Sequence, residues 1–292
     1  MGNINKRIVL VTGATRGIGK GTALALSGSD TIVYISGRSE FENQTSSLPG
    51  TLSATASEIS ERGGQAIAVK CDHSDDKQIA QLLERVIDEQ GKLDILVNCV
   101  YQVPDDLIVW KPFWQRPVEK HWNAMINIGL RAHYLACYHA VPHMVKAGCG
   151  SLVTVSSPAA RNYIHSIIYG LGKAAKDKMM HDMGKELREH NVAAFTLWPG
   201  IVRTERLQST IDSNLLLPEY EALKSGMESP ELTGRIIDAI DRSGTAMMYT
   251  GASWWNSMLA KSLDVFDIDG QQPETYEPLL GKPVMPTETM IK

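Results

Sequence analysis

The sequence predicts an α/β fold in which helices cover both faces of a doubly wound, mostly parallel sheet of seven strands. Two observations indicate this class. Short apolar runs alternate along the chain with longer amphipathic stretches, a rhythm typical of strand–helix–strand crossovers. The first run, Ile8–Val11, passes directly into a glycine-rich turn, which is how a strand of such a sheet commonly meets its helix.

The apolar runs give the strands in order. The strand candidates are Ile8–Val11, Ile32–Ile35, Ala66–Val69, Ile95–Val97, Leu152–Val155, Ala193–Leu197 and Met247–Thr250. Between the third and fourth runs, Lys77–Gln90 carries its apolar residues on one stripe, as a helix packed on a sheet does. Polar residues, glycine and proline dominate Ser39–Thr51, which we expect to form an exposed loop after the second strand.

The chain length suits a single domain. With 292 residues the protein can bury one large core, so we expect one domain across residues 1–292. The amphipathic segment 205–225 is expected to act as a lid over the substrate site. The tail, residues 251–292, is less regular and contains several prolines, so we expect it to wrap the body of the domain.

Composition excludes several classes of function. The net charge of −4 forms no basic stripe, which argues against nucleic acid as a partner. The four cysteines show neither metal-ligand spacing nor a paired framework, so we expect reduced thiols and no metal site. No apolar run reaches the roughly 18 residues of a membrane span, and no secretory signal is visible. The expected location is therefore the cytoplasm.

Two motifs carry the chemistry. Thr12–Gly19 reads TGATRGIG, in which Gly13, Gly17 and Gly19 allow a tight turn and a close approach of the backbone to phosphate. The helix that begins near Ile18 offers free N–H groups to the same phosphate. Tyr169 and Lys173 stand four residues apart, on one face of a helix, where the ammonium is expected to lower the pKa of the phenol. Together these motifs indicate hydride transfer with a tyrosine acid/base.

The order of the motifs resembles the short-chain dehydrogenase/reductase family over residues 6–260. The shared features are the glycine turn, Asp72, Asn98, Asn127, Ser156–Ser157, the Tyr169–Lys173 pair and Pro199–Thr204. Within the family the chain is most similar to the dehydrogenase/reductase member 1 subgroup, because both have a Ser-Ser-Pro run, a Leu-Trp-Pro-Gly-Ile-Val run and a long tail. The resemblance implies a Rossmann-type domain that works as a homodimer or homotetramer.

The resemblance also implies which residues bind the cofactor. They are Gly13, Thr15, Arg16, Gly17, Ile18, Gly19, Arg38, Asp72, Asn98, Pro199, Gly200, Val202 and Thr204. In the family the residue at Asp72 binds the adenine amine, although an isolated Asp would more simply cap a strand end. Cys99 stands where relatives usually have a second asparagine. A thiol cannot replace an amide, so that structural role is lost or passes to another group.

The end of the second strand favours NADP(H). Dehydrogenases that prefer NAD carry an acidic residue there, which accepts from the ribose hydroxyls. This chain has Gly37 at that position, followed by Arg38, and Arg16 in the glycine turn adds a second cation. Two guanidinium groups match a 2′-phosphate through paired hydrogen bonds.

Four side chains are expected to perform the reaction. Tyr169 exchanges a proton with the substrate oxygen, Lys173 holds the nicotinamide ribose, and Ser157 donates to the carbonyl oxygen. The resemblance implies that Asn127 holds a water that links Lys173 to solvent. Ser156 competes with Ser157, because the usual spacing to the tyrosine favours Ser156. The second serine of the pair is normally the catalytic one, and we select Ser157.

The expected function is reversible, NADPH-dependent reduction of a carbonyl compound to an alcohol. Two alternatives stay open: a non-catalytic NADP(H)-binding sensor or scaffold, and a specialised steroid or polyketide dehydrogenase. An apolar substrate is favoured by the uncharged residues of the expected walls, which are Val100, Tyr101, Val103, Ile164, Ile167 and Ile168. Arg161, His165 and Arg203 leave a keto acid open, and either Tyr163 or His165 is placed to touch the substrate.

Overall fold

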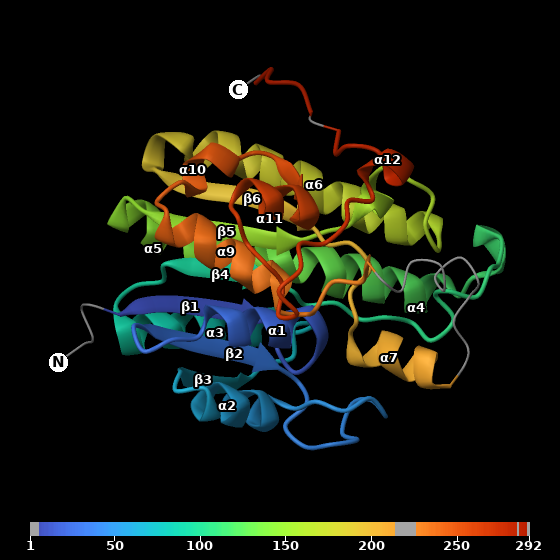
Figure 1. The fold of residues 1–292 in the computed structure, drawn as a ribbon, viewed down its shortest axis with the longest axis horizontal. Helices are drawn as coiled ribbons and strands as arrows, with labels where there is room; N and C mark the ends of the chain where they lie inside the picture. The colour runs from blue at the N-terminus through green and yellow to red at the C-terminus, as the bar shows by residue number, and fades with distance from the viewer. Residues whose placement is uncertain (1–5, 214–225, 285, 291–292) are drawn as a thin grey trace.

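The computed structural model describes residues 6–213, 226–284 and 286–290. Seven strands form one parallel sheet in the order β3-β2-β1-β4-β5-β6-β7 (Figure 1). The strands are β1 (Arg7–Thr12), β2 (Thr31–Gly37), β3 (Gln65–Lys70), β4 (Ile95–Asn98), β5 (Gly150–Val155), β6 (Val192–Trp198) and β7 (Ser253–Trp255). The order reverses between β1 and β4, and ligands bind at such a switch point in open parallel sheets.

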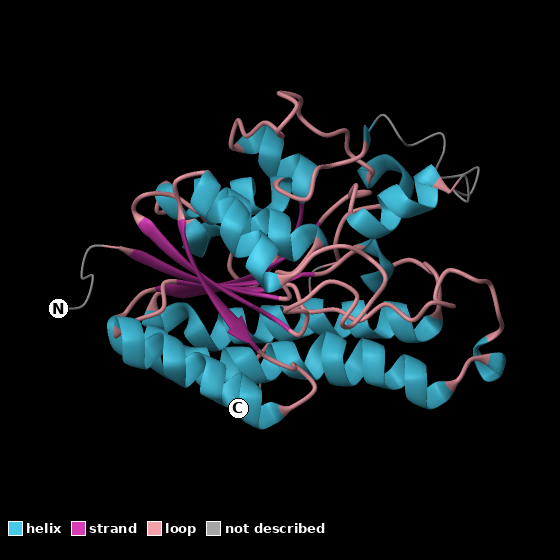
Figure 2. Ribbon diagram, turned by 90° about the horizontal axis from the view of Figure 1, so that it is seen from below, coloured by secondary structure: helices cyan, strands magenta, loops and turns pink. Residues whose placement is uncertain are grey.

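Helices cover both faces of the sheet (Figure 2). The long ones are α1 (Gly17–Leu26), α2 (Leu52–Glu61), α3 (Asp76–Gln90), α5 (Ala132–Ala147), α6 (Ile167–Leu187) and α9 (Leu232–Arg242). The shorter ones are α4 (Val118–Trp122), α7 (Glu205–Asp212), α10 (Ala246–Tyr249), α11 (Asn256–Ser262) and α12 (Glu277–Leu280). The predicted helix over 77–90 is confirmed as α3.

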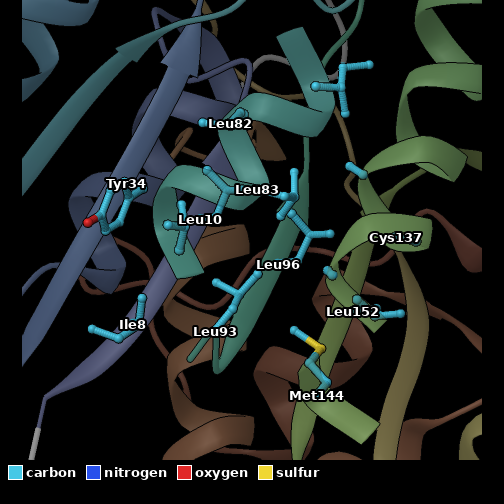
Figure 3. Packing of buried hydrophobic residues seen from close by; sticks show 14 of the residues in the cluster. Ile8, Leu10, Tyr34, Leu82, Leu83, Leu93, Leu96, Cys137, Met144 and Leu152 are labelled. Carbon is cyan, nitrogen blue, oxygen red and sulfur yellow. The ribbon is translucent and has the colours of Figure 1, made fainter. Parts of the chain in front are cut away.

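Strand pleating divides the core into two layers. Ile8 and Leu10 of β1 pack against α3, α5 and α6, whereas Val9 and Val11 pack against α1, α2, α9 and α11. Successive side chains of a strand point to opposite faces, so one apolar strand serves both layers. Figure 3 shows the first layer, in which Leu82 and Leu83 of α3 face β1 and β4. Continuous burial of β1, β2 and β6 explains why these strands read as unbroken apolar runs.

The seventh strand lies elsewhere than predicted. Met247–Thr250 was expected to be a strand, but Ala246–Tyr249 forms helix α10 and the strand is Ser253–Trp255. Ser253–Trp255 pairs in parallel with Thr196–Trp198 of β6, and the fully buried Trp255 ring packs on Trp198. Periodicity cannot separate a short apolar helix from a short strand. The tail, which was expected only to wrap the domain, therefore also supplies the edge strand β7 of the sheet.

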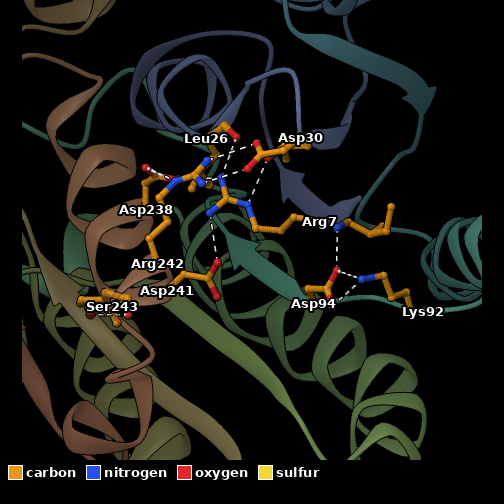
Figure 4. Close-up of polar contacts among 12 residues, drawn as sticks. Arg7, Leu26, Asp30, Lys92, Asp94, Asp238, Asp241, Arg242 and Ser243 are labelled. Atoms are coloured by element: carbon orange, nitrogen blue, oxygen red, sulfur yellow. Dashed lines mark hydrogen bonds and ion pairs between the residues drawn. The ribbon is translucent and has the colours of Figure 1, made fainter. Parts of the chain in front are cut away.

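Ionic contacts join the amino end of β1 to α9, on the side of the sheet away from the strands' carboxyl ends (Figure 4). Arg7 donates to Asp238 at 2.6 Å and to Asp241 at 3.0 Å, and Arg242 donates to Asp30 at 2.9 Å. The Arg7 side chain is largely buried, so its pairs are screened less than surface ones. These contacts lie at the opposite end of the sheet from the glycine turn.

Two further expectations concern the surface. Residues 39–51 form no helix or strand, as predicted, although Ser39 and Thr51 at its ends are buried. The first part of the expected lid is helix α7, and the remainder, residues 214–225, falls outside the described residues. Within the described ranges, no helix has both the length and the apolar character needed to cross a bilayer.

Candidate active site

A cavity of about 600 Å³ opens at the carboxyl ends of β1, β2 and β4. Nine of the expected cofactor residues line it: Gly13, Thr15, Arg16, Gly17, Ile18, Gly19, Arg38, Asp72 and Thr204. Asn98, Pro199, Gly200 and Val202 do not line it. The cavity therefore runs from the glycine turn to the end of β2 and reaches Val100, Tyr101 and Val103 on the other side.

The glycine turn has room only for glycine. Gly13 and Gly17 adopt positive φ angles of 71° and 56°, which side chains disfavour. A Cβ on Gly13 would lie 2.9 Å from the backbone of Val100, and one on Gly19 would lie 2.2 Å from the Gly13 carbonyl oxygen. Helix α1 begins at Gly17, and Gly17, Ile18 and Gly19 of its first turn, whose N–H groups have no partner within the helix, line the cavity. This cradle fits the pyrophosphate of a dinucleotide.

The two arginines near β2 have different surroundings. Arg38 is half exposed and lies 3.9 Å from Asp72. Arg16 donates to the Gly50 carbonyl oxygen at 2.9 Å and to Ser39 at 3.3 Å, so it holds the 39–51 loop against the glycine turn. Arg38 is consequently the freer of these two cations to meet a 2′-phosphate.

Asp72 caps the turn after β3. Its carboxylate accepts from the backbone N–H of Ser74 at 2.9 Å and from the Ser74 hydroxyl at 2.7 Å. Partial burial opposes ionisation, but these hydrogen bonds and the charge of Arg38 hold the pKa of Asp72 below its usual value. The capping role and a place on the cavity wall coexist in this residue.

Ser157, Tyr169 and Lys173 come together at the carboxyl end of β5. The Ser157 Oγ lies 3.3 Å from the Tyr169 hydroxyl. The Lys173 Nζ lies 5.5 Å from the centroid of the Tyr169 ring and 4.9 Å from that of Tyr101. Tyr101 lines the cavity and packs edge-on against Tyr169, with centroids 6.0 Å apart. The three residues thus lie behind Tyr101, next to the expected nicotinamide end.

Burial has the largest effect on the pKa values of Tyr169 and Lys173. It raises the pKa of Tyr169, against the hydrogen bond from Ser157, and it lowers the pKa of Lys173 to about 8. The phenol's pKa is thus raised, whereas the Tyr169–Lys173 spacing was expected to lower it. The main cause is desolvation, which disfavours the charged form of both groups.

The side chains of Ser156 and Ser157 point in different directions. Ser156 is buried and donates to the backbone carbonyl oxygen of Lys173 at 3.2 Å, whereas Ser157 faces Tyr169. The alternation of side chains at the end of β5 explains the split. Of the two serines, Ser157 is the one whose hydroxyl lies beside that of Tyr169.

Asn127 is not brought to Lys173. It is exposed on a π-helical segment, Asn123–Arg131, and donates to the side chain of Asn123 at 2.6 Å. A π-helix has a wider turn than an α-helix, so it rotates successive side chains to different faces. Asn98 is buried and donates to Cys137 Sγ at 3.3 Å.

Several site residues were missed by sequence reasoning. Lys176 is buried with its Nζ 3.5 Å from the Val155 carbonyl oxygen and 5.6 Å from the Tyr101 centroid. Its spacing of three from Lys173, on the same helix face, was an available signal. Glu228 accepts from the Gly200 N–H at 2.8 Å, and burial raises its pKa to about 7. No local pattern linked it to Gly200.

The loop before α6 places His165 at the tyrosine. Its ring packs edge-on against Tyr169 at 5.2 Å, its φ is +60°, and its carbonyl oxygen accepts from the buried Arg116 at 3.1 Å. Tyr163 in the same loop is 65% exposed. Of these two, His165 is the one that lies beside the reacting groups. In the described ranges, no group of three or more His, Cys, Asp or Glu residues could hold a metal ion.

The chain is similar to known proteins in sequence and in fold. A family model described as short chain dehydrogenase matches residues 7–214. The chain is 35% identical to human dehydrogenase/reductase SDR family member 1, over 94% of this chain and 87% of the relative. It is 30% identical to a 3-oxoacyl-acyl-carrier-protein reductase of Thermotoga maritima, over 68% of this chain and 75% of the relative. A crystal structure of an actinorhodin polyketide ketoreductase variant with NADPH superposes with a TM-score of 0.73, at 20% identity, over 87% of this chain and 97% of that one.

Proposed function

The chain belongs to the short-chain dehydrogenase/reductase family, and on that premise we propose that it reduces a small apolar carbonyl compound to an alcohol with NADPH, reversibly. The observation that carries the proposal is the 3.3 Å approach of Ser157 to the Tyr169 hydroxyl, beside Lys173 and behind Tyr101, which lines the glycine-turn cavity. The test mixes the protein with NADPH and a panel of ketones, quinones and aldehydes and follows the nicotinamide absorbance. No oxidation of NADPH across the panel would reject the proposal.

Each residue has a separate task. Bound NADPH would supply the hydride. Ser157 donates a hydrogen bond to the carbonyl oxygen and orients it, and Tyr169 delivers the proton that completes the alcohol. Because burial raises the pKa of Tyr169, its phenol keeps that proton at neutral pH. Lys173 binds the nicotinamide ribose beside the phenol.

The walls near Tyr169 support an apolar substrate. Tyr101, Val103 and Ile168 pack with Tyr169 around the buried residues Leu107 and Met125. Arg161 donates to the Lys282 carbonyl oxygen at 2.6 Å, so this cation is engaged by the tail. Pockets of this composition bury apolar ligands and use few polar groups to orient them. We propose a homodimer or homotetramer in the cytoplasm as the working form.

A second candidate is a non-catalytic NADP(H)-binding sensor or scaffold. Two observations favour it: the exposed position of Asn127, and Cys99 in place of the usual asparagine. The activity panel separates the two candidates, because a sensor would bind NADPH without oxidising it. A specialised steroid or polyketide dehydrogenase would instead act on one member of a broad panel.

Ser157→Ala is expected to lower kcat about tenfold to 100-fold, whereas Ser156→Ala should change it less than about threefold. The reason is that only Ser157 has its hydroxyl beside that of Tyr169, while Ser156 bonds the backbone of α6. Steady-state kinetics with NADPH and the best ketone of the panel measure both. A larger effect at Ser156 would mean that the spacing to the tyrosine was the better guide.

NADPH is expected to bind at least about tenfold more tightly than NADH, and Arg38→Asp should remove or reverse this preference. Arg38 lies on the cavity wall where an acidic residue would repel a 2′-phosphate. Calorimetric titration with both cofactors measures the ratio. The matched control is Arg85→Asp on α3, an exposed arginine that does not line the cavity. Equal affinities of the unmodified protein for the two cofactors would contradict the assignment.

A further inference from the structure

A carboxylate of the chain already occupies the phosphate end of the glycine turn. The Glu205 Oε2 accepts a hydrogen bond from the backbone N–H of Gly17 at 2.7 Å. Gly17 is the first residue of α1, so the carboxylate sits at the positive end of that helix. Free N–H groups at a helix N-terminus bind anions, and here the anion belongs to the protein itself.

Glu205 reaches this place from the opposite wall of the cavity. It is the first residue of α7, directly after Thr204, whose side chain caps that helix. A Cβ built on Gly17 would meet the Thr204 Cγ2 at 3.4 Å and the Glu205 Oε2 at 3.8 Å. Thr204, Glu205 and Arg206 line the same cavity as the glycine turn. The Glu205 side chain therefore reaches from the first residue of α7 to the first residue of α1, both on the wall of the cavity.

We propose that Glu205 is an internal anion which holds the pyrophosphate position of the free protein, must leave it when a dinucleotide binds, and so sets cofactor affinity. The inference rests on the dinucleotide-binding part of the proposed function and is independent of carbonyl reduction.

Electrostatics oppose simultaneous occupancy. The Gly17 N–H cannot bond fully to both the carboxylate and a phosphate oxygen, and like charges a few ångströms apart repel strongly in a partly buried site. Arg16 does not relieve this repulsion by pairing with Glu205. Its guanidinium donates to Gly50 and Ser39 instead, although the Glu205 charge opposes the lowering of the Arg16 pKa by burial. Rotation of the Glu205 side chain would free the N–H without unwinding α7.

An ordinary stabilising role makes a different prediction. An acidic residue in the first turn of α7 is favourable for that helix whatever the cavity contains. Glu205→Gln keeps the size and an oxygen acceptor but removes the charge. The matched control is Asp212→Asn, which removes one charge from the last residue of the same helix, away from the cavity.

The experiment titrates the unmodified 292-residue protein, Glu205→Gln and Asp212→Asn, in the absence of any carbonyl compound, with three probes. The probes are NADP⁺, inorganic pyrophosphate and adenosine 2′-monophosphate, which lacks the pyrophosphate, and calorimetry gives the dissociation constants. Glu205→Gln should tighten NADP⁺ and pyrophosphate by about 3- to 10-fold, the range expected for one charge at a helix N-terminus. Its affinity for adenosine 2′-monophosphate should stay the same, and Asp212→Asn should change none of the three.

A second variant protects the test against misfolding. Glu205→Asp keeps the charge but shortens the reach to Gly17, so it should also tighten NADP⁺, by less than the glutamine variant. Unchanged or weaker NADP⁺ binding in both variants would overturn the proposal, and so would an equal gain in Asp212→Asn. Failure of pyrophosphate and NADP⁺ to bind any of the proteins would also overturn it. Loss of carbonyl reduction alone, with the affinity gain intact, would reject only the proposed reaction.

Discussion

Tyr169→Phe is expected to lower kcat for carbonyl reduction by roughly 10²–10⁴-fold while leaving the affinity for NADPH within about twofold. The substitution removes one hydroxyl and retains the ring that packs on Tyr101 and His165. Ser157 then has no phenol beside it, and the carbonyl oxygen loses the proton donor that the proposal assigns to it. Steady-state kinetics and a fluorescence titration with NADPH measure the two effects separately.

The matched control for this variant is Tyr163→Phe. Tyr163 lies in the loop that joins Ser157 to α6, and its side chain is 65% exposed. Removal of its hydroxyl should leave kcat within about twofold. If Tyr169→Phe kept more than about a tenth of the activity, or if both variants lost it equally, Tyr169 would not be the proton donor.

The alternation of strands and helices made most of the fold predictable. The structure confirms the first six strands within a few residues. Five of them, β1, β2, β4, β5 and β6, have the apolar runs of strands buried on both faces, whereas β3 at the edge of the sheet is partly exposed. Met247–Thr250 contains two methionines, which suit a helix, and its sequence held no sign that Ser253–Trp255 would pair with β6. The pairing depends on burial of Trp255 against Trp198, a contact across the chain that local pattern cannot reveal.

The candidate site likewise has one part that the sequence predicts and another that it does not. The glycine turn and the Tyr169–Lys173 spacing depend on local geometry, so the sequence predicts both. Glu205 reaches Gly17 across 188 positions of the chain, and Glu228 reaches the Gly200 N–H across 28. Such contacts follow from the crossover of strands and from which loops meet at the carboxyl edge of the sheet. The position of Asn127 differs from the expected one for another reason: the segment that carries it is a π-helix, and its side chain is exposed.

Lys176→Met is expected to raise the free energy of unfolding of the cofactor-free protein at pH 7, by about 1–4 kcal/mol. Lys176 is 2% exposed, and its Nζ donates a long hydrogen bond, 3.5 Å, to the Val155 carbonyl oxygen. Burial, and then the like charge of Lys173, lower its pKa well below the ordinary 10.5, against the smaller opposing effects of Cys99 and Asp177. Methionine fills a similar volume without an amine to desolvate.

The pH dependence identifies the cause. Between the lowered pKa of the folded state and 10.5, the unfolded chain binds a proton at Lys176 that the folded protein does not. The free energy of unfolding therefore rises with pH in that window, by up to about 1.4 kcal/mol per pH unit, and this contribution is lost as the pH falls. The methionine variant lacks this contribution, so its advantage in the free energy of unfolding should shrink as the pH rises through that window towards 10.5. Lys173, whose pKa is lowered to about 8, is present in both proteins and contributes to both curves.

Urea unfolding at pH 7, 8, 9 and 10 measures the difference between the two proteins. Lys178→Met is the matched control, because Lys178 lies on the same helix, is 59% exposed and pairs with Asp182. An exposed pair of this kind contributes about 0.5 kcal/mol or less, so the control should be nearly unchanged at every pH. Two outcomes would show that Lys176 keeps its charge in the folded protein. Lys176→Met could be less stable than the unmodified protein, or its gain in the free energy of unfolding could be the same at every pH. In that event the ammonium would be held by the Val155 carbonyl oxygen and the Tyr101 ring face, and Lys173 and Lys176 would both carry charge near Tyr169.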